Sequence, residues 1–156
     1  MNSSLKQYKN LNSKHRKIIF YVIIGSLLFA VSMIALGFTG NELIFNNQKI
    51  EITGVYGETI PLSEIKSIEL VKKRPGLSRK IHGFSIGYRK KGYFKTKDGE
   101  KIKAIINKDY LPWILIIKET GEHIYFSSGK GSNEKLFKKI EKTLPNNGYN
   151  PALLSQ

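Results

Sequence analysis

An uncharged apolar stretch near the N-terminus, Ile18–Phe38, constrains this chain more than any other feature. It holds 21 residues without a charge, interrupted only by two glycines and two serines. A helix rising about 1.5 Å per residue would reach about 31 Å over this stretch, the thickness of the hydrocarbon core of a bilayer. A buried helix of a globular protein would show a polar stripe, and this stretch has none. The sequence therefore predicts a transmembrane helix over residues 18–38.

A cleavable secretory signal is the alternative interpretation of the same stretch. The basic segment Lys14–Lys17 precedes it, and Ala35-Leu36-Gly37 would serve as a small-residue cleavage site. The apolar stretch is longer than the core of a typical signal. That length favours an uncleaved anchor.

The charges on either side of the apolar stretch predict its orientation, because Lys and Arg resist translocation. In the twenty residues after it, Thr39–Glu58, the only cation is Lys49. Five cations and no acid precede it: Lys6, Lys9, Lys14, Arg16 and Lys17. We therefore predict a single-pass protein of the cell membrane, with a cytoplasmic N-terminus and an extracytoplasmic C-terminal domain.

Composition excludes several kinds of chemistry. The 156 residues include no cysteine, which excludes disulfides, thiolate metal sites and a cysteine nucleophile. The three histidines, His15, His82 and His123, are too far apart in the sequence to predict a metal site, and we expect no cofactor. The formal net charge of +14 suits nucleic acid, but the membrane segment and the lack of an RNA-recognition motif argue against that partner.

After the apolar stretch, polar and apolar residues alternate with a period of two. Lys49–Thr53 and Lys101–Ile106 are examples, and this period is typical of half-buried strands. Asp98-Gly99 and Thr120-Gly121 stand between such segments, which indicates hairpin turns. About seven short strands are predicted in this part of the chain.

A helix is predicted to close the domain over Ser132–Leu144. Its apolar residues recur with helical spacing, Ser132 is placed to cap the N-terminus, and Pro145 ends it. The expected organisation is a basic segment (1–17), a transmembrane helix (18–38), a folded domain (42–144) and a flexible tail (145–156).

Three sequence segments of the domain resemble the bacterial pleckstrin-homology (PH) domain family, over about residues 43–144. They are Tyr56-Gly57-Glu58-x-Ile60-Pro61-Leu62-Ser63-Glu64-Ile65-Lys66-Ser67-Ile68, then Arg79-x-x-His82-Gly83-Phe84-Ser85-x-Gly87, then Lys91-Gly92-Tyr93-Phe94. The resemblance implies a mainly β (α+β) fold. It would be a PH-like antiparallel barrel of about seven strands with a C-terminal amphipathic helix, preceded by one transmembrane helix. It implies a membrane context and supplies no catalytic motif.

The stretch from Lys72 to Lys97 carries ten cations and no acid. We interpret it as a flexible basic loop that would attract anionic lipid head groups. A solvated face on an already basic protein is the alternative. The predicted contact residues are Lys72, Lys73, Arg74, Arg79, Lys80, Arg89, Lys90 and Lys91.

No segment predicts an enzyme. Gly129-Lys130-Gly131-Ser132 lacks the spacing of a phosphate-binding loop and is interpreted as a strand-to-helix turn, and no nucleophile elbow is present. Trp113 is interpreted as a core residue. The expected function is therefore a non-enzymatic membrane protein whose domain binds an unknown protein partner or an anionic surface near the bilayer. The alternatives are an enzyme whose site the sequence does not reveal, and a PH-like domain secreted after signal cleavage.

Overall fold

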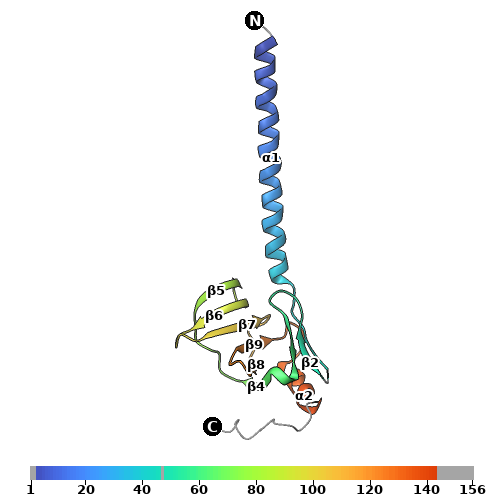
Figure 1. The fold of residues 1–156 in the computed structure, drawn as a ribbon, viewed down its shortest axis with the longest axis vertical. Coiled ribbons are helices and arrows are strands. Elements are labelled where there is room, and N and C mark those ends of the chain that lie inside the picture. Colours follow the sequence, from blue (N-terminus) through green and yellow to red (C-terminus); the bar gives the residue numbers. More distant parts are fainter. Residues whose placement is uncertain (1–2, 47, 144–156) are drawn as a thin grey trace. The chain divides into compact units, whose positions relative to one another are not determined.

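A computed structural model of the chain describes residues 3–46 and 48–143. The chain divides after Phe38 into two units, an N-terminal helix and a mixed α+β domain (Figure 1).

The N-terminal unit is one helix, α1 (Ser3–Phe38). Its part from Lys14 to Phe38 is long and apolar enough to cross a membrane, and a secretory signal near the N-terminus would meet the same criteria. The hydroxyls of Ser26 and Ser32 donate to the carbonyls of Ile23 and Leu28, so both are satisfied within the helix. A lipid environment requires this internal satisfaction of polar groups.

The domain contains two β-sheets and a C-terminal helix. Strands β1 (Leu43–Phe45), β2 (Lys49–Ile52) and β3 (Glu58–Pro61) form an antiparallel sheet in the order β1-β2-β3. A larger sheet has the order β4-β8-β9-β7-β6-β5. Its strands are β4 (Ile65–Val71), β5 (Leu77–Ile86), β6 (Arg89–Thr96), β7 (Lys101–Ile106), β8 (Trp113–Lys118) and β9 (His123–Ser127). A 3-10 turn (Leu62–Glu64) links the two sheets, and α2 (Asn133–Thr143) ends the described chain.

The six-stranded sheet is strongly curled. Its edge strands β4 and β5 would stand about 24 Å apart in a flat sheet, whereas the chain from Val71 to Leu77 spans at most about 22 Å. Val71 and Leu77, from opposite edges, both pack against one apolar cluster. The face that carries this cluster is therefore the concave face; its buried members are Phe94, Ile102, Ala104, Ile106 and Trp113.

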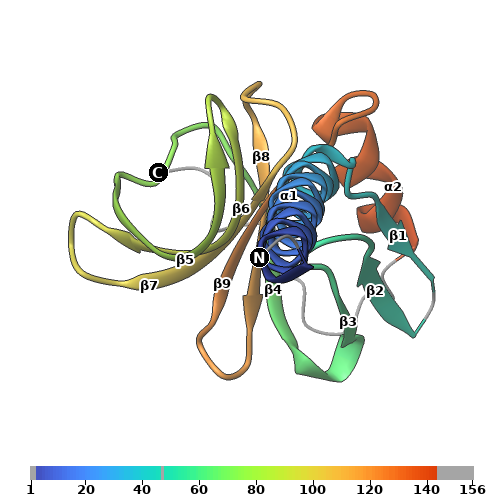
Figure 2. The same cartoon turned by 90° about the horizontal axis from the view of Figure 1, so that it is seen from above.

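The opposite, convex face carries the main core. Ile105, Ile114, Ile116, Ile124 and Phe126 pack there against the three-stranded sheet and against Phe137 and Ile140 of α2. In Figure 2, β1–β3 and α2 lie on one side of β4, β8 and β9, and β5–β7 curve away on the other. The convex face is thus covered over one half only.

The fold confirms the α+β class and corrects the PH-like barrel. Nine strands in two sheets replace about seven, and β7 pairs with β9 in parallel. Among the described residues no pairing joins β4 to β5, so the curled sheet does not close into a barrel.

Several local predictions are confirmed. Asp98-Gly99 forms the turn between the antiparallel strands β6 and β7, and Thr120-Gly121 forms the turn between the antiparallel strands β8 and β9. The φ angles are +86° at Gly99 and +82° at Gly121. The amide of Glu134 donates to Ser132 Oγ at 3.2 Å, as expected for a helix cap. Leu144, Pro145 and the predicted flexible tail lie outside the described residues.

Candidate binding face

The basic stretch is a β-hairpin, which corrects its interpretation as a flexible loop. Strands β5 and β6 meet in a two-residue turn, Gly87-Tyr88, with a positive φ of +55° at Gly87. Gly83 and Gly92 are cross-strand partners, each with a φ of +130°. A Cβ atom on either glycine would collide with the opposite strand's backbone, so this pair allows the two strands to approach.

The pairing of β5, β6 and β7 aligns three cations on the convex face. Arg79 is paired with Lys95, and Lys95 with Lys101. Side chains directly opposite each other on neighbouring strands lie about 5 Å apart, so the three charges form a short row. All three residues are exposed, and no carboxylate among the described residues forms an ion pair with any of them. We call Arg79, Lys95 and Lys101 the cationic row.

Aromatic rings lie directly beside the cationic row. His82, Tyr93 and Lys103 form the next row across the same strands. The ring centroids of His82 and Tyr93 are 4.8 Å apart, and Tyr56 lies 5.7 Å from His82 on its other side. Lys101 Nζ lies 4.6 Å from the Tyr93 ring centroid, within the range of a cation–π interaction. The face therefore offers charge and flat aromatic surface together.

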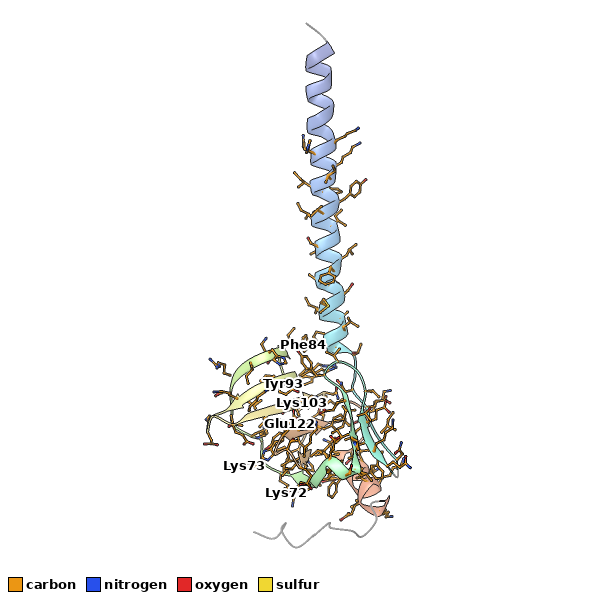
Figure 3. The ribbon with its side chains drawn as sticks, in the orientation of Figure 1. Lys72, Lys73, Phe84, Tyr93, Lys103 and Glu122 are labelled. Carbon is orange, nitrogen blue, oxygen red and sulfur yellow. The ribbon has the colours of Figure 1, made fainter. Side chains whose placement is uncertain are left out.

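An ion-pair network separates this open face from the covered core. Glu58 of β3 contacts Lys103 Nζ at 2.9 Å and Lys118 Nζ at 2.8 Å, and Lys118 also contacts Glu122 at 3.0 Å. Two acids balance two lysines, so the network is neutral. Figure 3 labels Tyr93, Lys103 and Glu122 in this region of the curled sheet.

The charges within the network shift two pKa values. Burial acts to raise the pKa of Glu58, but hydrogen bonds from Lys118 and Lys103, and their charges, outweigh it and lower that pKa. Burial acts to lower the pKa of Lys118, and its bonds to Glu58 and Glu122 outweigh it and raise that pKa. Both groups are therefore held in their charged forms, as structural ion pairs are.

Lys91 lies on the same face one row further along the hairpin, paired with Phe84 and Ile105. Its side chain is fully buried, and its Nζ donates to the Thr39 carbonyl. Burial, assisted by the charge of Arg89, lowers the pKa of Lys91 to about 8. A buried amine that is bonded to a carbonyl serves to hold the hairpin to residue 39.

The eight cations predicted to contact an anionic surface do not share one surface. Lys72, Lys73 and Arg74 lie in the β4–β5 connection, where Arg74 Nε bonds Asp109 Oδ1 at 2.9 Å. Arg79 belongs to the cationic row, whereas Lys80 pairs with Phe94 of the concave face. Arg89 and Lys90 follow the hairpin turn. Lys91 is buried, which corrects its prediction as a contact residue.

Sequence reasoning missed the Glu58 network and left both Lys95 and Lys101 out of the predicted contact residues. The Glu58 ion pairs and the alignment of Lys101 both depend on which strands pair. The Asp98-Gly99 turn in the sequence could have indicated that Lys95 lies opposite Lys101. Trp113 is buried in the concave cluster, as predicted. His123 Nδ1 contacts Glu100 Oε1 at 2.5 Å, at the end where β7 and β9 pair.

Residues 128–132 form the predicted strand-to-helix turn between β9 and α2. A cavity of about 440 Å³ lies there, lined in part by Lys108, Ser128 and Asn133. The Asn133 side chain accepts from the Ser128 amide at 2.8 Å and donates to the Pro112 carbonyl at 2.8 Å, so its polar atoms are used within the fold. In residues 3–46 and 48–143 no three His, Asp or Glu side chains lie close enough to hold a metal ion.

Comparisons of the chain with protein-family models, with curated proteins and with solved structures give no match.

Proposed function

We propose that this chain is a non-enzymatic, single-pass membrane protein whose domain binds the acidic surface of a protein partner close to the bilayer. The observation that carries the proposal is the cationic row, three exposed charges in register beside the ring of Tyr93. Aligned charges of one sign steer an oppositely charged partner and fix its register. Aromatic residues and arginine are the types enriched where proteins meet.

The start of the domain supports a position close to the membrane. Asn41 is buried and locked into the domain: its amide donates to Asn107 Oδ1 at 3.0 Å, and Asn107 Nδ2 donates back to the Asn41 carbonyl at 3.0 Å. Only Thr39 and Gly40 separate it from Phe38, where α1 ends.

We infer further that the domain is extracytoplasmic and that the chain is a membrane-anchored relative of the bacterial PH family. The charge difference around α1 supports the orientation. A C-terminal amphipathic helix packed on a strongly curled sheet supports the resemblance.

Site-specific crosslinking in native membranes tests the binding role. We would place a photoreactive phenylalanine analogue at Tyr93 of the full chain and compare two triple variants with equal charge change. Reversal of Arg79, Lys95 and Lys101 to Glu should abolish the protein adduct. Reversal of Lys66, Lys135 and Lys138, which are exposed on β4 and α2, should leave it. An adduct that survives the first triple change, or one that contains only lipid, would contradict the proposal.

Extraction tests the anchor. The full chain should stay in the membrane fraction after alkaline carbonate washing, because α1 satisfies its own backbone hydrogen bonds. A released protein whose N-terminus maps to Leu36–Thr39 would instead establish a cleaved signal and a secreted domain.

A further inference from the structure

The tip of the β5–β6 hairpin differs in chemistry from the cationic row at its other end. Ile86 and Tyr88 are 47% and 50% exposed. Arg89 and Lys90 follow directly; the Arg89 guanidinium lies 5.9 Å from the Tyr88 ring centroid, and Lys90 Nζ donates to the Gly87 carbonyl at 3.3 Å. Isoleucine, tyrosine and cations combined on one exposed turn suit the layer where lipid head groups meet hydrocarbon.

Chain connectivity limits how far this tip can be from the end of the apolar helix. Lys91 is bonded to Thr39, and Thr39 follows Phe38 directly. The tip lies two residues beyond the row of Phe84 and Lys91, which is about 7 Å along the strand. The polar layer on each side of a bilayer is about 5–8 Å thick. If α1 spans a bilayer, the residue that follows it lies in or beside this layer, and the short connection through Lys91 leaves the tip able to reach the head groups.

Charge favours anionic lipid as the contact. No acid occurs between Lys72 and Lys97, so no carboxylate within the hairpin repels an anionic surface. A basic residue close to such a surface contributes about 1 kcal/mol of attraction. Arg89 and Lys90 are placed to supply it beside the two apolar side chains.

We propose that the hairpin tip, Ile86 to Lys90, enters the anionic head-group layer of the same bilayer that α1 spans. The domain is then held to the membrane at two points, and the cationic row at the opposite end of the hairpin stays available to the protein partner. This inference rests on the proposed membrane anchoring.

An environment-sensitive dye on the full chain in lipid nanodiscs tests the inference. The chain has no cysteine, so Tyr88→Cys gives one labelling site at the tip, and Asp98→Cys gives a matched site in the turn at the other end of β6. In discs containing phosphatidylglycerol we expect a blue-shifted emission at position 88 that is quenched by spin-labelled lipid. Position 98 should show neither effect.

Two further measurements test whether the contact is with anionic lipid: a change of lipid composition and a double substitution at the tip. The shift at position 88 should disappear in discs of phosphatidylcholine alone, and also when Arg89→Gln and Lys90→Gln are combined. An equal shift in both kinds of disc would overturn the anionic assignment. Equal emission at positions 88 and 98 would overturn the inference as a whole. The proposed function would survive that result if the chain still resists carbonate and still forms the Tyr93 adduct, so the two failures are distinguishable.

Discussion

The two halves of the convex face belong to one sheet, but one half carries buried apolar side chains and the other carries mainly polar and aromatic ones. Over β4, β8 and β9 the face is apolar, with Ile68, Ile114, Ile116, Ile124 and Phe126 at most 1% exposed. Over β5 and β6 it carries the exposed cations Arg79 and Lys95 together with aromatic rings, and only Lys91 is a fully buried cation there. The strands alternate in the same way in both halves, so the difference arises from what covers them: β1–β3 and α2 cover the first half.

The border between the halves shows how the change is accommodated. Glu58, on the last strand of the covering sheet, reaches both Lys103 and Lys118. Lys103 is nearly buried, with its side chain 5% exposed, and a buried charge is tolerated when it is paired. The network thus ends the apolar core without leaving an unpaired charge beneath the covering sheet.

The largest effect should come from truncating the covered half. Ile116→Ala is expected to lower the free energy of unfolding by about 2–5 kcal/mol, because it removes a fully buried side chain and leaves a cavity. Ile86→Ala in the open half should change it by less than about 0.5 kcal/mol. Denaturant unfolding in detergent can be followed through Trp113, the single, buried tryptophan. Similar losses from both variants would show that the open half is covered after all.

Glu58→Gln, at the border between the covered and open halves, should lower the free energy of unfolding by less than Ile116→Ala does. Losing the carboxylate weakens the pairing of the nearly buried Lys103, which we expect to cost about 1–3 kcal/mol. Glu51→Gln is the matched control, because its pair with Lys49 at 3.5 Å is exposed and should contribute less than about 1 kcal/mol. Equal losses from the two would mean that Glu58 acts as an ordinary surface charge.

Glu58→Gln should also change how the free energy of unfolding depends on pH in the acidic range. The pKa of folded Glu58 is lowered, so its contribution is complete above the unfolded pKa of about 4.3 and is lost as the pH falls through the folded value. The difference in free energy of unfolding between wild type and Glu58→Gln should therefore shrink as the pH falls. A constant difference down to the lowest pH would contradict this assignment.

Sequence reasoning succeeded where structure is determined locally. The apolar stretch, the Asp98-Gly99 turn and the cap at Ser132 each depend on neighbours in the chain. It failed for β5, because β5 is a long edge strand with extra residues at Ser78 and Ile81 that break the period of two. The stretch from Lys72 to Lys97 was therefore interpreted from its charges alone, as a flexible basic loop.

Of the cationic row, only Arg79 was among the predicted contact residues, and its alignment with Lys95 and Lys101 was not predicted. A single sequence shows that Arg79, Lys95 and Lys101 are cations, but their alignment depends on register across three strands. The burial of Lys91 depends on Thr39, a residue 52 positions away. The parallel pairing of β7 with β9 is likewise set by the packing of the whole sheet.

The smallest effect on stability at neutral pH is expected for Lys91→Met. The cost of burying the ammonium group offsets much of its bond to Thr39, so the change should stay within about 1 kcal/mol of zero at pH 7. The pH dependence should separate the two proteins. The folded pKa of Lys91 is about 8 against about 10.5 unfolded, so between these values the folded chain has released a proton that the unfolded chain still binds. Wild type should therefore gain stability relative to Lys91→Met as the pH rises from about 8 to about 10.5. Lys95→Met, which removes an exposed cation of the same strand, should give a profile parallel to wild type. If Lys91→Met is also parallel to wild type, Lys91 is solvated, and the hairpin is not held to residue 39 by a buried amine.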